Sequence, residues 1–384
     1  MRIVERFDVI VVGAGPAGST LAHRLATEGV RVALLDKARF PRDKPCGGGI
    51  TVRGLQHLPI DITPVVEDRV THVELGFGYR ERFERSASEP LVLMTQRRRL
   101  DAHLAEQAAA QGADFRDGVR VRGIELDADG AVVATDTDRM STRVVIGADG
   151  CNGVSAKALG LAGGLTYGVA YEGNVPWDAI DPDRWRGRMW LEFDTVPGGY
   201  AWVFPKGEHA NLGVGGWSRE GPRLRDHLTR LCSEAGVDPG AIEGVRGYRL
   251  PLRRPGARVA RGPAIVIGDA AGLVDPMSGD GLYEAFLSSR LAAAAVTDLL
   301  AGRTANLDGF QATLDGALSR HRAVSWAGKL LFEQAPGLAL RLAKSERLWS
   351  KVVRRIQGES GGLHGPGTAR LETISRAIYR PARG

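Results

Sequence analysis

The segment from Phe7 to Phe40 constrains the fold more than any other part of the chain. A short apolar run rich in β-branched residues, Asp8 to Val12, is followed by glycines, and from Pro16 onward the apolar residues recur at helical spacing. A second apolar run, Val30 to Leu35, then ends in an acidic residue. These features predict a strand, a tight turn, a helix and a second strand, which together form a βαβ unit.

The first turn of this unit has GxGxxG spacing. It consists of Gly13, Ala14, Gly15, Pro16, Ala17 and Gly18. Gly13 allows a sharp turn, Gly15 lets the backbone approach a pyrophosphate, and Gly18 lets the helix pack closely on the strand. The helix N-terminus adds free N–H groups and a positive dipole. Asp36 follows the second strand, where a carboxylate accepts hydrogen bonds from an adenosine ribose. We therefore predict a dinucleotide site, which this unit alone does not assign to FAD or to NAD.

Two later motifs favour FAD. One is Gly147-Ala148-Asp149-Gly150 at a strand end, and the other is Ile267-Gly268-Asp269-Ala270-Ala271-Gly272, followed by Asp275-Pro276 and Gly279-Asp280-Gly281. Asp269 at a strand end can hold a ribitol hydroxyl, and the helix that begins near Gly281 can face a pyrophosphate or a flavin edge. NAD has no ribitol, so the three motifs together predict FAD.

The loop from Lys37 to Ile50 has neither helical nor strand periodicity and contains Cys46 before three glycines, Gly47, Gly48 and Gly49. Consecutive glycines let the backbone come close to a large flat group. A flexible connector is the alternative interpretation.

The composition is that of an ordinary globular protein and is sufficient for two cores: 384 residues, 43% hydrophobic and 25% charged. We predict an α/β protein in which a Rossmann-like FAD-binding domain is interleaved with an antiparallel-sheet substrate domain, followed by a C-terminal helical region. The expected bounds are 1–56, 95–160 and 256–300 for the first domain, 57–94 and 161–255 for the second, and 301–384 for the helical region and tail.

Local patterns add detail to this plan. Arg69 to Met94 alternates like strands around a charged turn near Arg80 to Arg85, and Asp129-Gly130 predicts a hairpin. Leu307 to Gln357 is helical in pattern, and we expect the tail from Gly358 to be weakly ordered.

The chain resembles a known family at these motifs. GAGPAG, Arg97 before Leu100-Asp101, GADG and GDAAGLVDPMSGDG resemble the p-hydroxybenzoate-hydroxylase class of FAD proteins. Within that class, the loop around Cys46 and the segment PGGYAWVFP from Pro197 to Pro205 resemble the geranylgeranyl reductase family, whose P-x-x-Y-x-W-x-F-P element is matched at every fixed position. The similarity extends from Phe7 to Leu300.

The resemblance implies non-covalent FAD, Arg97 close to the flavin, and hydride addition to carbon–carbon double bonds of prenyl chains. The expected cofactor-binding residues are Gly13, Gly15, Pro16, Ala17, Gly18, Asp36, Lys37, Cys46, Gly47, Gly48, Arg97, Asp149, Gly268, Asp269, Pro276, Gly279, Gly281 and Leu282. The electron donor is expected to be NAD(P)H or a ferredoxin-like protein.

Four residues are candidates for the chemistry. Hydride addition to an isolated alkene needs protonation of the other carbon, and Cys46 is the candidate donor, with a small buried hydrophobe as the alternative. Tyr200, Trp202 and Phe204 alternate along a predicted strand and face one side, either as a substrate wall or as an ordinary core face. Tyr200 and Trp202 are expected to act beside Cys46 in the catalytic region.

Other functions on the same scaffold remain open. A monooxygenase or halogenase acting on a hydrophobic or aromatic small molecule would use the same cofactor placement, but halogenases have W-x-W-x-I-P where this chain has Tyr200-Ala201-Trp202-Val203-Phe204-Pro205. A flavin-binding redox sensor or a carrier of prenyl lipids is a non-enzymatic alternative.

The charge distribution and the cysteine spacing argue against a nucleic-acid partner and against a metal site. The net charge is +6, but the arginines are spread along the chain, so no nucleic-acid partner is expected. Cys46, Cys151 and Cys232 form no CxxC pair and have no histidine at ligand spacing, so no metal site is expected and a reducing cytoplasm fits.

The segment from Leu338 to Ile356 mixes large apolar residues with arginines and lysines. It is expected to be a helix that either lies on the inner face of an anionic membrane or packs on its own domain. The sequence does not indicate the oligomeric state.

Overall fold

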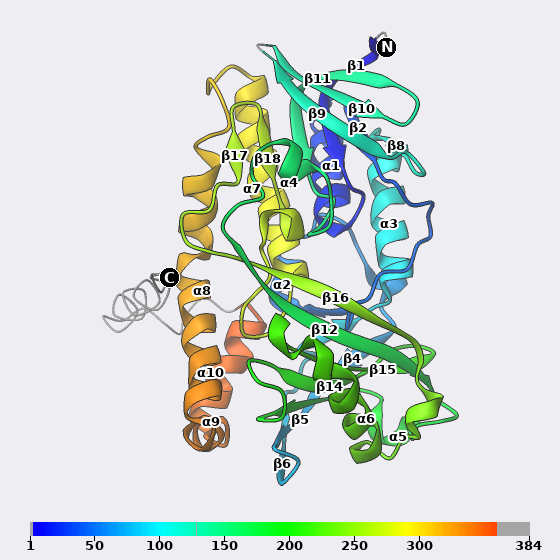
Figure 1. The fold of residues 1–384 in the computed structure, drawn as a ribbon, viewed down its shortest axis with the longest axis vertical. Coiled ribbons are helices and arrows are strands. Elements are labelled where there is room, and N and C mark those ends of the chain that lie inside the picture. Colours follow the sequence, from blue (N-terminus) through cyan, green and yellow to red (C-terminus); the bar gives the residue numbers. More distant parts are fainter. Residues whose placement is uncertain (1–2, 128, 359–384) are drawn as a thin grey trace.

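The computed structural model describes residues 3–127 and 129–358, which form two large β-sheets with helices packed around them (Figure 1). The predicted βαβ unit is present as β1 (Ile3–Val12), α1 (Pro16–Thr27) and β2 (Val32–Leu35). β1 pairs in parallel with β2 on one side and with β11 (Arg139–Gly147) on the other. The expected weakly ordered tail lies outside the described residues from residue 359 onward.

The first sheet has the order β17-β18-β11-β1-β2-β8, and the hairpin of β9 and β10 extends it beside β11. The remaining strands are β8 (Asp114–Arg116), β9 (Val121–Asp127), β10 (Gly130–Thr135), β17 (Ala260–Arg261) and β18 (Ala264–Val266). In the predicted hairpin, Asp127 pairs with Gly130.

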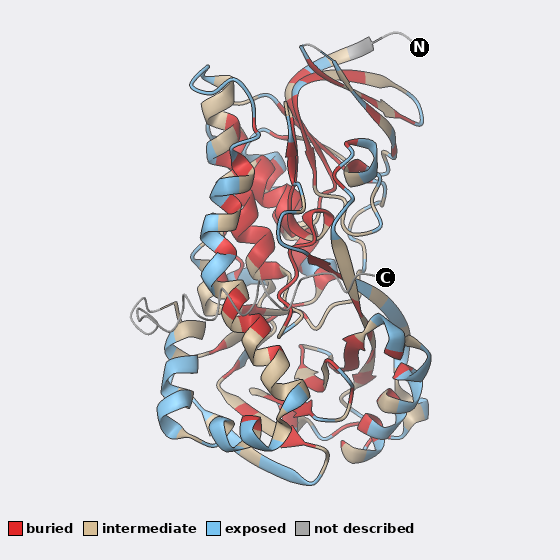
Figure 2. Cartoon of the chain, turned by 60° about the vertical axis from the view of Figure 1, so that its left-hand side comes forward, coloured by how far each residue is buried: buried red, intermediate tan, exposed pale blue. Residues whose placement is uncertain are grey.

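Helices α3 (Arg97–Ala110) and α7 (Leu282–Leu300) pack beside α1. Figure 2 shows that the core of this half is the most extensively buried part of the chain. This buried core holds the loops at the carboxyl ends of β1, β11 and β18 in fixed positions.

The second sheet has the order β16-β12-β15-β14-β13-β5-β6. Its strands are β5 (His72–Phe77), β6 (Glu81–Ser86), β12 (Leu165–Pro176), β13 (Arg188–Phe193), β14 (Tyr200–Pro205), β15 (His209–Trp217) and β16 (Glu243–Arg253). The pairing is antiparallel except between β5 and β13. One face packs against α6 (Leu224–Glu234), and the other faces a cavity.

Two features of this sheet differ from the sequence expectations. The sequence patterns missed β16, because its first half is exposed and carries charges and glycines without an apolar alternation. The charged turn expected near Arg80 to Arg85 is wrong, because Glu81–Ser86 forms β6 and the turn lies before it. Gly78 and Tyr79 make that turn with φ values of 63° and 58°.

A small third sheet packs with α3 and α7 on one side and with β5 and β13 on the other. It has the order β3-β7-β4. Its strands are β3 (Gly49–Thr51), β4 (Asp68–Val70) and β7 (Val92–Met94). The short helices are α2 (Val52–Leu55), α4 (Ser155–Ala158) and α5 (Pro182–Trp185), and the 3-10 turns are Thr63–Val65, Ser218–Arg223, Pro239–Ala241 and Gly268–Ala271.

The C-terminal region is helical, as predicted, and consists of α8 (Phe310–Gln334), α9 (Pro336–Ala343) and α10 (Glu346–Ile356). The single helix expected from Leu338 to Ile356 is wrong, because Ser345 is extended and separates α9 from α10. Among the described residues, no helix is long and apolar enough to cross a bilayer.

Candidate active site

A cavity of about 880 Å³ lies between the two large sheets. This volume is near the upper end of the range for small-molecule and cofactor sites. The predicted site residues that line it are Gly13, Gly15, Pro16, Ala17, Asp36, Lys37, Cys46, Gly47, Gly48, Arg97, Asp149, Tyr200, Trp202, Phe204, Gly268, Asp269, Pro276, Gly279, Gly281 and Leu282. The exception is Gly18, which lies beneath the first turn.

The first glycine turn is close-packed on one side and open on the other. A Cβ added at Gly13 would lie 2.5 Å from the carbonyl oxygen of Ala148, and one at Gly18 would lie 1.9 Å from that of Gly13. At Gly15, by contrast, the nearest atoms to an added Cβ are guanidinium nitrogens of Arg42, at 3.6 Å, and of Arg97, at 3.9 Å. The turn therefore presents free backbone and two cations to open space, which fits a pyrophosphate.

A buried carboxylate holds both arginines in place. Asp101 is completely buried and accepts hydrogen bonds from Arg97 Nε at 2.7 Å and Nη2 at 2.8 Å. Arg42 Nη1 lies 2.9 Å from the same carboxylate. Burial lowers the pKa of Arg97, but Asp101 outweighs this effect and raises it overall. Arg42 and Asp101 were missed as site residues, although Asp101 stands four positions after Arg97 on a predicted helix.

Asp36 links the end of β2 to the glycine turn. Its Oδ2 accepts a hydrogen bond from the backbone N–H of Ala14 at 2.9 Å, and its Oδ1 accepts one from Ala38 at 2.9 Å. Arg42 Nη2 lies 3.8 Å from Oδ2. The carboxylate is thus fixed beside the first glycine turn, at the end of the cavity where an adenosine ribose is expected.

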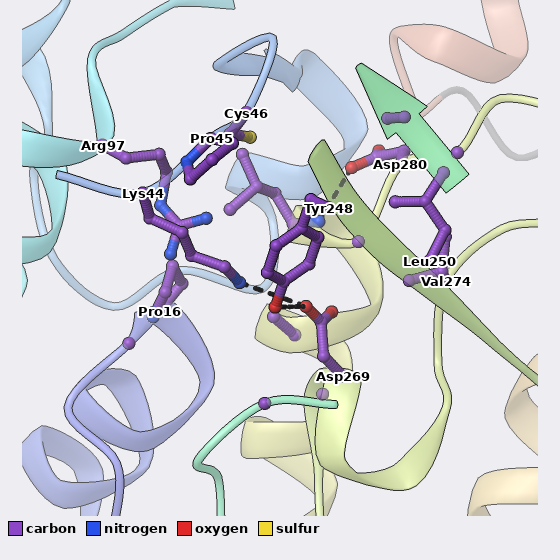
Figure 3. A pocket seen from close by; sticks show the side chains of 18 of the residues that line it. Pro16, Lys44, Pro45, Cys46, Arg97, Tyr248, Leu250, Asp269, Val274 and Asp280 are labelled. Carbon is purple, nitrogen blue, oxygen red and sulfur yellow. Dashed lines mark hydrogen bonds and ion pairs between the residues drawn. The ribbon is translucent and has the colours of Figure 1, made fainter. Parts of the chain in front are cut away.

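Asp269 lies across the cavity from the start of α1 (Figure 3). Its Oδ2 is 3.1 Å from Lys44 Nζ and accepts a hydrogen bond from Tyr248 Oη at 3.2 Å. Burial raises the pKa of Asp269, but Lys44, Arg97 and Tyr248 together hold it below its usual value, so the group is ionised. Lys44 and Tyr248 were missed from sequence, and Tyr248 belongs to the strand that the patterns did not reveal.

Asp149 has a structural role in the described chain. Its Oδ2 accepts hydrogen bonds from the backbone N–H groups of Val154, at 2.7 Å, and Ser155, at 3.0 Å. Burial raises the pKa of this carboxyl group. Its Oδ1 is buried and has no hydrogen-bond partner within the described ranges.

The loop after the third motif is held by its own carboxylates. Asp275 Oδ1 accepts from the backbone N–H groups of Met277, at 3.0 Å, and Ser278, at 2.8 Å. Asp280 Oδ1 accepts from Leu282 N at 2.8 Å, where α7 begins. This loop places the N-terminus of α7 at the wall of the cavity.

A buried cluster connects this loop to the C-terminal helices. His321 Nε2 lies 3.2 Å from Asp275 and 3.3 Å from Glu284. The three ligand atoms are close enough together to hold a metal ion. However, the guanidinium groups of Arg53 and Arg355 contact the same imidazole and already supply positive charge. The cluster joins the Asp275 loop and the start of α7 to α8 and α10 through His321.

The glycine loop is tightly packed against the cavity wall. A Cβ at Gly47 would lie 2.8 Å from the Phe204 ring, and one at Gly48 would lie 2.0 Å from the carbonyl oxygen of Thr95. The Thr95 N–H in turn donates to Gly48 O at 2.9 Å. Cys46 lines the cavity, and its Sγ accepts from Gly48 N at 3.4 Å. Packing of this kind is inconsistent with a flexible connector.

The aromatic strand β14 forms an apolar wall. Tyr200, Trp202 and Phe204 line the cavity, with successive ring centroids 5.8 and 5.9 Å apart. Trp202 Nε1 donates to Asn211 Oδ1 at 2.9 Å, and Gly213 leaves room for the indole, since an added Cβ would lie 2.1 Å from it. Further apolar residues that line this half are Val92, Met94, Met189, Leu191, Leu250 and Val274.

The comparisons with known proteins agree with this geometry. The family model described as an FAD binding domain matches residues 6–306. The geranylgeranyl diphosphate reductase of Rhodobacter capsulatus is 33% identical over 313 residues, which cover 79% of this chain and 78% of the relative.

Two solved structures share the fold. The geranylgeranyl bacteriochlorophyll reductase-like protein of Thermoplasma acidophilum has a TM-score of 0.75 at 20% identity, covering 98% of this chain and 97% of that chain. A flavin-dependent brominase also reaches 0.75, at 16% identity, covering 98% and 99%. These likenesses concern the fold alone. Because the family model covers most of the chain and the reductase relative matches along a similar length, the chain belongs to the geranylgeranyl reductase family of FAD-dependent oxidoreductases.

Proposed function

We propose that this oxidoreductase saturates carbon–carbon double bonds of a prenyl chain of the geranylgeranyl type. One observation carries the proposal: a single cavity has a polar half at the glycine turns and an apolar half over β14. The glycine loop with Cys46 lies between them, packed on Phe204. A cofactor in the first half would therefore meet an apolar chain in the second, next to a thiol.

The residues of the apolar half would bind and orient the substrate. A chain of fifteen to twenty carbons, at about 0.8 kcal/mol per buried CH₂, gains on the order of 10 kcal/mol of gross apolar contact. No charged anchor for the chain is then needed. Tyr200, Trp202 and Phe204 would hold the alkene in place and exclude water from it, and Cys46 would give a proton to one alkene carbon. Reduced FAD, when bound, supplies the hydride.

The electron donor is proposed to be NAD(P)H or a ferredoxin-like protein that visits transiently. The FAD domain is the one nucleotide-binding fold within the described residues, so the donor would have to share access to the same cavity or reach its rim.

Anaerobic incubation of the dithionite-reduced holoenzyme with geranylgeranyl diphosphate or a polyprenyl quinone tests the reaction. Mass spectrometry should show a gain of two hydrogens per reduced bond, with reoxidation of the flavin in the absence of oxygen. A product that gains an oxygen atom, and only when oxygen is admitted, would instead establish the monooxygenase alternative.

Contact with a membrane surface is a further part of the proposal. Of the described large apolar residues with exposed side chains, Leu338, Leu342, Leu348 and Val352 lie on α9 and α10. The same helices carry several arginines and lysines. Trp349, Val353 and Ile356 instead pack on the domain, and Ile356 also lines the cavity. The exposed side chains would therefore meet lipid close to the cavity.

Vesicle binding tests this part. Binding to anionic vesicles should exceed binding to neutral ones and should weaken with salt, because surface charges are screened over about 8 Å at physiological ionic strength. The double variant Leu348→Ser, Val352→Ser should bind less, whereas Val154→Ser, at an exposed site elsewhere, should bind like the wild type. Equal binding to both kinds of vesicle would exclude the proposed electrostatic contact.

A further inference from the structure

A second, small cavity of about 30 Å³ lies behind the Cys46 loop. This volume is sufficient for a water molecule, since one needs only about 10–15 Å³. The cavity is lined mainly by polar groups, including Gln96, Asn174, His209, Asn211 and Arg246. Cys46 and Glu172 line both this cavity and the large one. A water in the small cavity would lie next to both residues.

Two buried ionisable side chains flank the backbone of Cys46. Lys206 is 4% exposed, and its Nζ donates to the carbonyl oxygen of Cys46 at 2.9 Å. Glu172 on β12 is 7% exposed, and the backbone N–H of Cys46 is among the groups that stabilise its charged form. The backbone carbonyl and N–H of one residue therefore each interact with a buried ionisable group.

Glu172 faces the large cavity by its position in β12. Gly168, Ala170 and Glu172 alternate on the face that lines the cavity, whereas Val169 and Val175 pack on the opposite side. Glu172 is the ionisable member of that alternating row, and the sequence patterns gave no reason to select it because it stands inside an ordinary strand.

The environment keeps the proton affinity of Glu172 high. Burial raises its pKa, and Asp43 adds to this effect, while Lys206, the Cys46 N–H and Asn211 oppose it, with a net rise. Burial also lowers the pKa of Lys206, partly offset by Glu172. A carboxyl group in this state exchanges protons closer to neutral pH than an exposed one does.

The same cluster supports the aromatic wall. Asn211 accepts from Trp202 Nε1 and donates to Asn174 Oδ1 at 3.0 Å. Lys206 Cε would lie 3.2 Å from a Cβ at Gly48, so the lysine stem also packs under the glycine loop. Loss of Lys206 would affect the position of the loop, whereas loss of the Glu172 proton need not.

We propose that Glu172 returns a proton to Cys46 after each reduction, through water in the small cavity, and that Lys206 is a positioning residue for the loop. The inference rests on the proposed function, in which Cys46 protonates the substrate carbon. The O–H bond of Glu172 breaks, an S–H bond forms again on the Cys46 thiolate, and Glu172 is then protonated from solvent. This step is a proton transfer, and no group is oxidised or reduced in it.

Kinetics separate this relay from a structural role. Glu172→Gln keeps the shape of the side chain but removes its transferable proton. Cys46 already carries its own thiol proton, so this variant should still support one burst of reduction. Later turnovers should slow by about 100-fold, a usual effect of losing a positioned acid or base. Cys46→Ala should show no burst. Glu243→Gln, an exposed change on neighbouring β16, is the matched control and should behave as wild type.

Infrared spectroscopy of the oxidised holoenzyme gives a readout without turnover. Because Glu192 and Asp149 also have raised pKa values, the readout is the wild-type spectrum minus that of Glu172→Gln, which should contain a protonated carboxyl band that titrates above the usual range of glutamate and exchanges in D₂O. The band should be absent from Glu172→Gln, present in Glu243→Gln, and shifted to higher pH in Lys206→Met, because a neighbouring positive charge is lost.

The outcomes are distinct. A missing band, or wild-type steady-state turnover in Glu172→Gln, overturns the relay and leaves the reductase assignment intact. A wild-type enzyme that reduces no isoprenoid overturns the proposed function, and the relay with it.

Discussion

Arg97 donates two hydrogen bonds to the completely buried carboxylate of Asp101, at 2.7 and 2.8 Å. Asp101 also pairs with Arg42 at 2.9 Å, so one acid orients both cations that face the first glycine turn. Asp101 thus offsets part of the positive charge beneath the candidate pyrophosphate site and leaves the rest to attract a ligand.

Asp101→Asn should destabilise the fold and weaken FAD binding together. Breaking a buried pair by removing one partner costs about 3–5 kcal/mol, because the other charge is left uncompensated. Chemical denaturation and titration of the apoprotein with FAD measure the two effects. Asp298→Asn removes an exposed pair with Arg303 and should cost less than about 1 kcal/mol. Equal effects of the two changes would contradict this account.

Asp36→Ala and Asp269→Ala should both weaken FAD, but at different ends of the molecule. Asp36 is fixed beside the glycine turn, so its loss should also weaken binding of ADP, which carries the adenosine and pyrophosphate alone. Asp269→Ala should leave ADP affinity nearly unchanged, since we predict its contact with the ribitol. Competition titrations with ADP and FAD make the comparison. A protein that takes up no FAD and binds NAD tightly would overturn the assignment of Asp36 and Asp269 to the two ends of FAD.

Cys46→Ala should keep FAD and lose turnover if the thiol delivers the proton. Cys46→Ser should retain more activity than Cys46→Ala, because the hydroxyl still carries a donor. Flavin absorbance reports cofactor content and product analysis reports turnover. Wild-type turnover in Cys46→Ala would make Cys46 a packing residue while leaving the reductase assignment in place.

Trp202→Ala should chiefly raise KM for long prenyl substrates, by about tenfold, with kcat little changed. The wall contact is made equally in the ground state and the transition state, so its loss appears in KM. A ten-carbon substrate should be affected less than a twenty-carbon one. Trp202→Phe, which keeps an aromatic wall, should lie between. An equal fall in kcat for both chain lengths would instead indicate that Trp202 positions the reacting groups.

The stability of the second sheet should depend on Glu192. This buried residue accepts from Tyr79 N at 2.6 Å and Trp190 Nε1 at 3.1 Å, and burial raises its pKa to about 7. Its usual pKa is 4.5, so between these two values the folded state keeps a proton that the unfolded state releases. Stability from this group is therefore complete below pH 4.5 and lost as pH rises toward 7.

Glu192→Gln removes that titration. The unfolding free energy of the wild type should fall relative to the variant over this range, and the difference should level off above it. Glu125→Gln, on the exposed side of β9, should follow the wild type at all pH values. Parallel curves for wild type and Glu192→Gln would contradict the assignment.

Sequence patterns gave the βαβ unit, the strand-end motifs and the aromatic strand, because each depends on local spacing. They missed Tyr248 and Glu172, since neither lies in a motif and each reaches the site through strand pairing. They also missed Arg42 and Lys44, whose roles depend on Asp101 and Asp269, far away in the sequence. The break between α9 and α10 falls in the polar run from Lys344 to Arg347, which contains no proline or glycine to mark the end of a helix.

The strand order of the first sheet has a consequence for the nascent chain. β1 is paired on one side by β11, and β11 is paired in turn by β18, with Val12 opposite Gly147 and Gly147 opposite Val266. The turn at Gly13 leaves the ribosome before β18 does, and its supporting strands are complete only once residue 266 has been synthesised. Non-local pairing of this kind is slow to form. The cofactor should therefore join late in synthesis, and truncation before β18 should leave a chain that cannot retain it.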